Sequence, residues 1–367
     1  MLYRCANEPK HAMIQPRAVT IATLALVTAL SGQTTLPASR PESAPAARGK
    51  LLWPRDAQRV IARVDGTDLT LDEMLRHVEE RHAPGLRDYL ATPSGQRDLA
   101  APMAATWVRM YADLCALRNE ARYRNLPAKD LDAALSASLK VGFEAWLTEY
   151  VAGRQRFGET PELTQERINL LLSRYQREHG LAREVEGLLA ALVPAPDKEP
   201  EIHAFYTRHA RIFGGTVTFA HILIHHRDPV TGELLEGEAR ERATNKVAEV
   251  RARLRPDGSN FAEVAALLSD DRRTASRGGE FGRVGRLDDR LPAILCRTAW
   301  ELADGAWAGP VESPFGIHFV RRISFVQEQF VLYTDAAKPE IAAAMRRYLQ
   351  EELLFEVRAR RRVTLAY

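Results

Sequence analysis

The chain has 367 residues, of which 46% are hydrophobic and 27% are charged, an ordinary composition for a globular protein of about two domains. Its formal net charge is +3, but residues 1–50 hold six basic and two acidic residues, so the remainder is close to neutral. A neutral body argues against a nucleic-acid-binding protein, and no segment after the N-terminal region has the roughly 18 apolar residues that span a bilayer.

The N-terminal segment has the pattern of a secretory signal peptide. Arg17 supplies a positive charge, and residues 18–30 (AVTIATLALVTAL) form an apolar core of the usual length. We therefore expect residues 1–32 to be a signal peptide that directs the protein to the periplasm or another extracytoplasmic compartment; an uncleaved anchor is the alternative. Residues 33–50 are rich in Pro, Ala and Ser, which predicts a disordered linker over 33–55.

Residues 56–213 predict a mostly helical domain. It opens with a short strand at 60–64, a tight turn at Asp65-Gly66 and a capping box, TLDE at 70–73, which begins a helix. In the next helix, apolar residues recur three and four positions apart, a spacing that places them on one face. They are Leu99, Met103, Trp107, Met110, Leu114, Leu117 and Ala121. We interpret this stripe as core, with a binding surface for another polypeptide as the alternative.

Three further helices complete this predicted domain. One begins near Leu131, and the next is expected to be capped by Thr160-Pro161. A proline-rich break at 194–200 then precedes a helix that starts at Pro200.

The pattern changes after residue 213, where β-branched and aromatic residues at 216–224 predict a strand. The later elements, in chain order, are a helix at 238–254, a second capping box at 260–263 (NFAE) with its helix, a glycine-rich turn at 278–285, a helix from Pro292 to Trp300, and strands at 309–312 and 317–323. The order β-α-α-β-α-β-β within about 110 residues predicts one compact α+β domain.

The C-terminal segment, residues 326–367, predicts a helix that begins at Pro339 and a final strand at 363–367. A single helix is marginal in water on its own, so we expect this segment to pack on the helical domain. The basic run at 358–362 (RARRR) lies near the end of the helix, where it complements the helix dipole, and we expect it to face solvent.

Four blocks within residues 216–325 resemble the parvulin family. They are FAHILI (219–224), NFAEVAALLSDD (260–271), ASRGGEFG (275–282) and AWELADGAWAGPVESPFGIHFVRR (299–322). The resemblance implies that residues 214–325 are a peptidyl-prolyl cis/trans isomerase domain with an FKBP-like α+β fold and a small, mostly antiparallel sheet. The flanking parts resemble the helical domain of SurA- and PrsA-type exported foldases, so the implied architecture is multidomain, with the parvulin domain inserted in a mostly helical chaperone domain.

The implied reaction needs neither a metal nor a cofactor. Rotation about an X–Pro amide is slow because partial double-bond character gives a barrier of roughly 18–20 kcal/mol. No bond is made or broken, so an enzyme has to hold the proline ring in an apolar cup, exclude water and favour the twisted amide.

The resemblance also assigns site residues. The positions that match the family's catalytic network are His221, Asp271, His318 and Ser313. The positions that match or adjoin its substrate cup are Phe281, Leu291, Leu295 and Phe315. The family usually has Met and Phe where this chain has Leu291 and Leu295, so a catalytically weak domain that only grips extended chains is the alternative. The implied partners are unfolded or partly folded exported polypeptides that contain proline, with no nucleic acid and no stable membrane span after signal removal.

Overall fold

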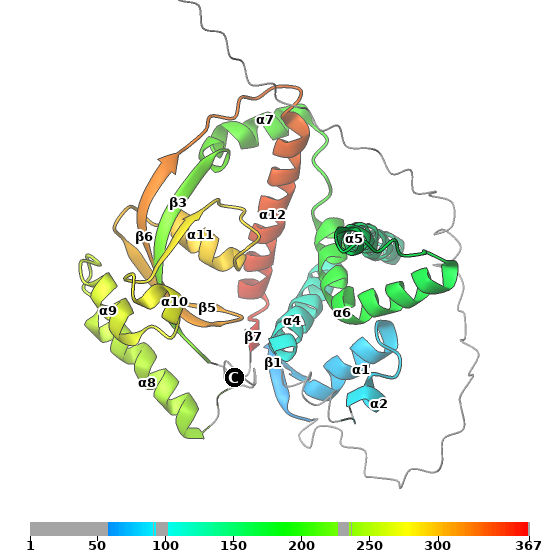
Figure 1. Ribbon diagram of the computed structural model, residues 1–367, viewed down its shortest axis with the longest axis horizontal. Helices are drawn as coiled ribbons and strands as arrows, with labels where there is room; N and C mark the ends of the chain where they lie inside the picture. Colours follow the sequence, from blue (N-terminus) through cyan, green and yellow to red (C-terminus); the bar gives the residue numbers. More distant parts are fainter. Residues whose placement is uncertain (1–57, 91, 93–101, 227–234, 236, 366–367) are drawn as a thin grey trace, which may run out of the picture. The chain divides into compact units, whose positions relative to one another are not determined.

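The computed structural model describes residues 58–90, 92, 102–226, 235 and 237–365 (Figure 1). The expected signal peptide and linker, Leu99 and the last two positions of the expected C-terminal strand lie outside these residues. Within the described part of the chain, no helix combines the length and apolar character needed to cross a membrane.

The N-terminal part of the described chain is mostly helical (Figure 1). It begins with a hairpin of β1 (Val60–Val64) and β2 (Thr67–Thr70). The helices that follow are α1 (Leu71–Arg81), α2 (Leu86–Leu90), α4 (Pro102–Tyr123), α5 (Ala128–Arg156), α6 (Gln165–Leu192), α7 (Glu199–Arg208) and a short 3₁₀ turn at Ala210–Ile212. Pro200 lies in the first turn of α7, as the sequence predicts.

A small antiparallel sheet joins the two ends of the described chain. The order of its strands is β2-β1-β7, and β7 (Thr364–Leu365) pairs with β1 through Ala62 opposite Leu365. Asp65 and Gly66 both have positive φ, 53° and 81°, which is the conformation that a two-residue hairpin turn requires. The sheet therefore holds residues from the beginning and the end of the chain in one hydrogen-bonded unit.

The first two helix predictions for this domain are confirmed. Thr70 and Glu73 form the expected capping box: the Thr70 amide donates to Glu73 Oε2 at 2.7 Å and the Glu73 amide donates to Thr70 Oγ1 at 3.3 Å. The stripe on α4 is core, because Leu114, Leu117 and Ala121 are fully buried. They pack in one cluster with residues of α1, α6 and the C-terminal helix.

The predicted cap at Thr160-Pro161 is wrong. Both residues lie in the irregular segment before α6, and the helix begins four residues later. The N-cap is Thr164, whose Oγ1 accepts from the amide of Arg167 at 3.2 Å. Thr160 and Thr164 both precede this helix, and Thr164 is the one whose side chain accepts from an amide of its first turn.

The α+β part is built on a four-stranded antiparallel sheet of order β4-β3-β6-β5. Its strands are β3 (Gly215–Ile224), β4 (Glu280–Val284), β5 (Trp307–Ser313) and β6 (Gly316–Gln327). Its helices are α8 (Gly237–Arg253), α9 (Phe261–Leu268), α10 (Arg272–Ala275) and α11 (Ala293–Glu301). The mostly antiparallel sheet is confirmed, and so is the predicted element order except for α10, a short helix that the sequence did not predict.

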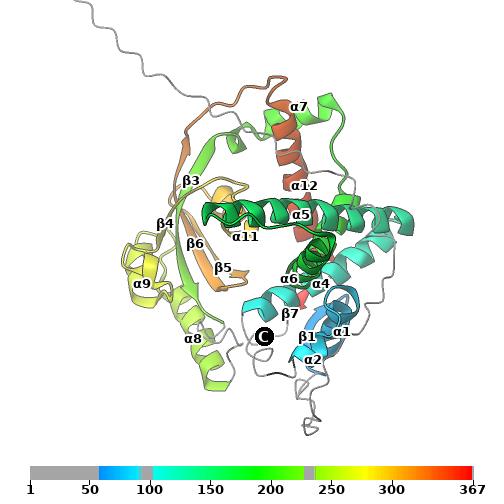
Figure 2. The same ribbon diagram turned by 45° about the vertical axis from the view of Figure 1, so that its right-hand side comes forward.

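The two faces of this sheet carry separate cores, because successive side chains of a strand point to opposite faces. Ala220, Ile222 and Ile224 pack with residues of α8 and α9. Val217 and Phe219 pack on the other face with residues of α11. Figure 2 shows α8 and α9 on one side of the sheet and α11 on the other. His221 follows the alternation of Val217 and Phe219, so it belongs to the α11 face.

The second predicted capping box, at Asn260, is wrong. The Asn260 side chain does not cap α9. Its amide group instead accepts from the backbone N–H of Arg255 at 2.9 Å and donates to the carbonyl of Arg253 at 2.8 Å. A side-chain amide offers both a donor and an acceptor, and here it satisfies two backbone groups at the end of α8.

The C-terminal helix α12 (Lys338–Arg360) packs on the helical part. Leu353 and Val357 join the core that contains α4, and Ile341 packs against α7 residues. The expectation that the basic run 358–362 faces solvent is wrong for Arg358 and Arg361, whose side chains are 24% and 17% exposed, and right for Arg360, at 46%. Arg358 makes two hydrogen bonds of 2.7 Å to Asp113, a buried residue of α4.

A second buried carboxylate of α4, Glu120, is the hydrogen-bond partner of Arg360 and Arg361. Glu120 is fully buried, and it accepts from Arg360 at 2.8 Å and from Arg361 at 3.0 Å. A buried carboxylate without a partner is strongly unfavourable, so the basic run is needed where α12 meets α4.

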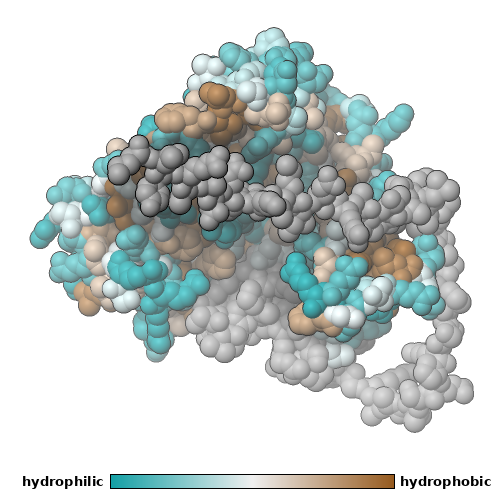
Figure 3. All heavy atoms as spheres, turned by 45° about the horizontal axis from the view of Figure 1, so that its top comes forward, coloured by the Kyte–Doolittle hydropathy of each residue, from teal (hydrophilic) through white to brown (hydrophobic). Residues whose placement is uncertain are grey.

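On the face shown in Figure 3, hydrophobic residues form separate patches within a mostly hydrophilic surface. The large exposed hydrophobic side chains come from several elements, among them Phe157 after α5, Leu170 in α6 and Leu267 in α9. Hydrophobic side chains that are scattered in this way are normal on a protein surface, so they do not define a binding face for an unfolded chain.

Replacing Arg358 by Met should lower the free energy of unfolding of the helical part by about 3 kcal/mol, because it leaves Asp113 buried without its bidentate partner. Urea unfolding followed by helical circular dichroism measures the effect. Arg177→Met, at an exposed position of α6, is the control and should change stability by less than about 0.5 kcal/mol. Equal unfolding midpoints for the two variants would contradict the assignment.

Candidate active site

Two buried histidines face each other across neighbouring strands. In the register of β3 and β6, His221 lies opposite Val320 and His318 lies opposite Leu223, so both side chains project from the same face. Their Nδ1 atoms are 3.3 Å apart, and the rings stack with centroids 5.5 Å apart. The exposed fractions are 5% for His221 and 1% for His318, so both imidazoles are out of bulk water.

The carboxylate of Asp271 extends this pair at one end. His221 Nε2 lies 3.0 Å from Asp271 Oδ2, and Thr274 Oγ1 donates to the same oxygen at 2.9 Å. The other oxygen, Oδ1, accepts from the amide of Arg273, because Asp271 is the N-cap of α10. Asp271 therefore caps α10 and also forms one end of the histidine network. The sequence reasoning did not include Thr274, three residues after Asp271, whose only signal was its place one helical turn further on.

Ser313 extends the pair at the other end. Ser313 Oγ lies 2.7 Å from His318 Nε2 and accepts from the amide of Phe315 at 3.1 Å. The hydroxyl keeps its own proton while it accepts from this amide, so it can donate to His318 Nε2. Asp271, which only accepts when ionised, sets the direction: His221 donates to it from Nε2 and accepts at Nδ1, so His318 carries its proton on Nδ1.

The positions of the protons then follow from one residue to the next along the network. His318 Nδ1–H donates to His221 Nδ1, which leaves the proton of His221 on Nε2, where it donates to Asp271. Every ring nitrogen then has one partner with both imidazoles neutral and Asp271 ionised. A buried polar network in which each member is satisfied holds its side chains in one arrangement.

The pKa values agree with these protonation states. Burial and the neighbouring His221 lower the pKa of His318 to about 3. Burial also lowers the pKa of His221, although the hydrogen bond to Asp271 opposes this shift. Burial disfavours the charge of Asp271, but hydrogen bonds from Thr274 and His221 outweigh it and hold the pKa of this carboxyl below its usual value.

A glycine lets the turn before β4 approach His221. The His221 amide donates to the carbonyl of Gly279 at 2.9 Å, and a Cβ on Gly279 would lie only 2.3 Å from the His221 carbonyl oxygen. Gly278 and Gly279 also have positive φ, 68° and 83°, as the glycine-rich sequence predicts. The turn therefore braces the backbone that carries the histidine.

The residues that match the substrate cup have different surroundings. Phe281 is partly buried, stacks on Phe219 at 5.3 Å and meets the edge of His221 at 5.7 Å. Leu291 is partly buried beside the same core, whereas Leu295 is only 2% exposed within it. Phe315 is 59% exposed in the turn between β5 and β6. Phe281 thus adjoins His221 with accessible surface, Leu291 has accessible surface beside the same core, and Leu295 has almost none; the binding roles of all four stay predictions.

A four-stranded antiparallel sheet with a buried histidine pair, a carboxylate and a hydroxyl on one face is the arrangement of a parvulin-type isomerase domain. Residues 221–324 match the family model described as Rotamase, the PPIC-type PPIASE domain. Over these residues the chain is similar to parvulin-type domains, and its sequence relatives include SurA and PrsA foldases.

Among these relatives, a chaperone SurA of Chromohalobacter salexigens is 29% identical over 163 residues, which cover 44% of this chain and 35% of that protein. A foldase protein PrsA of Clostridium kluyveri is 33% identical over 97 residues, covering 26% of this chain and 28% of that one. The chain thus spans about a third of the length of the curated relatives that it matches. The match to the solved structure of PrsA from Streptococcus pneumoniae covers 81% of this chain and 89% of that chain, at 13% identity and a TM-score of 0.31.

The low pKa of His318 predicts a pH dependence of stability. Between pH 6.5 and 3, the unfolded chain binds a proton at this histidine that the folded domain excludes, so stability falls as the pH falls through this range. In His318→Gln the slope of unfolding free energy against pH should be smaller by about one proton. Urea midpoints measured at a series of pH values test this, with the exposed His203→Gln of α7 as the control that keeps the original slope. A His318→Gln slope equal to that of the control would refute the buried neutral state.

Proposed function

We propose that this chain is a peptidyl-prolyl cis/trans isomerase and folding chaperone for exported proteins. The observation that supports it most is the continuous network from Asp271 through His221 and His318 to Ser313, which lies within the residues that match the family model. Because the chain spans about a third of its relatives' length, the activity of the whole protein rests on this site rather than on overall similarity.

The network would act on the amide by electrostatics. In a planar X–Pro amide, conjugation places partial negative charge on the carbonyl oxygen, and the twisted amide loses this conjugation and part of the charge. A fixed carboxylate beside the carbonyl destabilises the planar state more than the twisted one, which lowers the barrier. Asp271 would supply that charge, and the neutral imidazoles would hold it without cancelling it.

The apolar side of the site would hold the proline ring. Phe281 offers an aromatic face beside His221, and Leu291 offers an aliphatic one. Burial of the ring against these side chains removes water from the amide, which strengthens the interaction with Asp271.

The proposed clients are unfolded or partly folded polypeptides that contain proline, met outside the cytoplasm. The relatives are named chaperone SurA and foldase protein PrsA, and the first 32 residues have the pattern of a signal peptide. Both points favour an extracytoplasmic foldase.

An isomerase assay on a proline-containing tetrapeptide tests the proposal with the full chain. We expect His221→Ala to lower kcat/KM on the order of 100-fold, because it breaks the network in the middle, and Asp271→Asn on the order of 10-fold or more, because it removes the charge while keeping the shape. His203→Ala, an exposed histidine of α7, is the matched control and should retain wild-type turnover. Unchanged turnover in His221→Ala with the fold retained would refute the role assigned to the pair.

A holdase with little turnover is the second candidate. It is favoured by the 2% exposure of Leu295, which leaves a smaller apolar surface for the proline ring than two accessible side chains would. If the wild-type chain adds nothing to the spontaneous isomerisation rate but still prevents aggregation of an unfolded protein, the holdase is correct. Turnover that depends on His221 would exclude it.

A further inference from the structure

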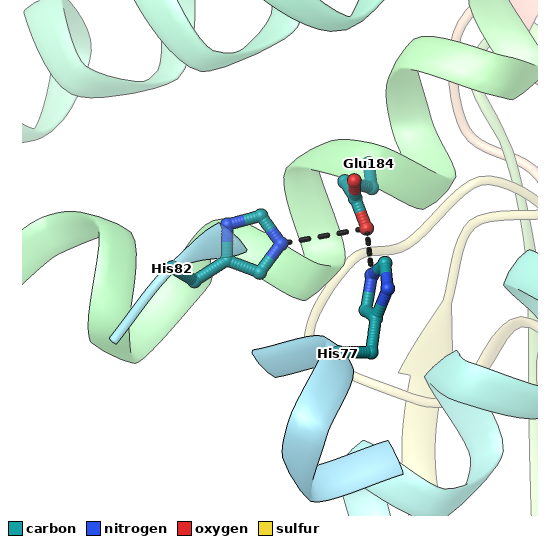
Figure 4. Close-up of side chains that lie close together, drawn as sticks. All are labelled: His77, His82 and Glu184. Carbon is teal, nitrogen blue, oxygen red and sulfur yellow. Dashed lines mark hydrogen bonds and ion pairs between the residues drawn. The ribbon is translucent and has the colours of Figure 1, made fainter. Parts of the chain in front are cut away.

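Three side chains of the helical part meet at one point, far from the histidine pair in the sequence. His77 lies on α1, His82 is the C-cap of that helix, and Glu184 lies on α6 (Figure 4). Glu184 Oε2 is 2.6 Å from His77 Nε2 and 3.4 Å from His82 Nε2. One donor atom of each residue lies within 4.8 Å of the other two, so a single cation can reach all three.

His82 is held in an unusual way. Its exposed fraction is 9%, and its buried Nε2 atom, although 3.4 Å from Glu184 Oε2, makes no hydrogen bond. Most buried polar atoms have such a partner, so this nitrogen calls for an explanation. It faces Glu184 Oε2, the same carboxylate oxygen that lies beside His77 Nε2, and a metal ion bound between the three side chains would give it a partner.

A glycine makes room for this histidine. Gly180 lies one helical turn before Glu184 on α6, and a Cβ at this position would be 2.4 Å from His82 Nδ1 and 2.5 Å from its Cγ. Glycine weakens the middle of a helix, so its presence here indicates that the close approach of the ring matters. The Nδ1 side of the ring lies against Gly180, and Nε2 lies 3.4 Å from Glu184 Oε2.

The second oxygen of Glu184 is already occupied. Oε1 lies 2.7 Å from Arg81 Nε and 3.4 Å from Arg118, so Oε2 alone is directed at the two imidazoles. The ion pairs of Oε1 with these arginines favour the ionised form of Glu184 and fix the orientation of its carboxylate. An ionised carboxylate whose other oxygen is fixed by hydrogen bonds is the usual state of a metal-binding carboxylate.

We propose that His77, His82 and Glu184 form a binding site for a divalent zinc-like cation. Two imidazole nitrogens and one carboxylate oxygen are a typical zinc donor set, which leaves a fourth position for water. With metal–ligand bonds of about 2.1 Å, neighbouring donors in a tetrahedral site are about 3.4 Å apart. The separation of His82 and Glu184 already has this value, and the distance from His77 Nε2 to Glu184 Oε2 has to grow from 2.6 Å toward it, which the partial exposure of His77 allows.

The two arginines oppose the cation, and their exposure decides how strongly. Arg81 is 48% exposed and Arg118 is 32% exposed, so solvent screens both charges and Arg81 can turn outward. They lower the affinity below that of a site without them while still orienting Glu184. A bound cation would join the end of α1 to the middle of α6 and stabilise the folded helical part.

Zinc titration of the full chain after EDTA treatment and dialysis tests the site. We expect calorimetry to show one zinc ion bound per chain at this site, and His82→Ala and Glu184→Gln each to weaken it on the order of 100-fold. His179→Ala is the matched control, since this residue lies on α6 one position before Gly180, is 41% exposed and should leave binding unchanged. Zinc binding of equal strength in the wild type, His82→Ala and Glu184→Gln would overturn the proposal, as would binding that disappears only in His225→Ala.

A measurement on the wild type covers the case in which the variants do not fold. X-ray absorption of the zinc-loaded chain should show two imidazoles with oxygen ligands and no sulfur. The proposal would also be overturned by a spectrum with fewer than two imidazole ligands, or by the absence of bound zinc after dialysis against a micromolar excess of zinc. The outcome does not depend on the isomerase, because none of these residues belongs to the histidine network.

Discussion

The antiparallel pairing of β3 with β6 determines whether the isomerase site exists. The ladder runs from Gly215 opposite Gln327 to Ile224 opposite Ile317, so it fixes the register over the whole length of β3. A slip of one residue on either strand would send its histidine to the face that packs on α8 and α9. Both strands are buried on that face by large apolar side chains, and a slip would expose them or bury polar groups in their place. The core therefore enforces the geometry of the histidine pair.

The two parts of the molecule stabilise buried polar groups in different ways. In the α+β part, the buried imidazoles are neutral and each nitrogen has a partner along one chain of hydrogen bonds. In the helical part, the buried carboxylates Asp113 and Glu120 are paired with arginines of α12. A neutral network suits the proposed mechanism, in which Asp271 presents one uncancelled charge to the amide. Ion pairs suit the attachment of α12, which is distant in the sequence, because an arginine makes charged hydrogen bonds to a carboxylate only when the two groups are correctly oriented.

Much of the α+β part and its site could be predicted from sequence, because strand alternation and four motif blocks in order restrict it strongly. His221, His318, Asp271 and Ser313 come together as the resemblance implies, whereas Thr274 was missed since a threonine in a four-residue helix has no pattern of its own. Caps were less predictable: Asn260 follows the capping pattern, but the competing backbone groups of α8 lie within its reach. The arginines of 358–362 and the cluster of His77, His82 and Glu184 could not be predicted, because their partners lie about 100 or more residues away.

The pairing of β7 with β1 has a consequence for the order in which this protein acquires its structure. Ribosomes release the chain from the N-terminus, so Ala62 emerges some 300 residues before Leu365, its neighbour in the sheet. Throughout that interval the outer edge of β1 has no strand beside it, and the acidic residues of α4 await α12. The α+β part, whose strands all fall between Gly215 and Gln327, can complete its own sheet meanwhile. A nascent foldase of this design would itself need protection of an open strand until β7 has emerged.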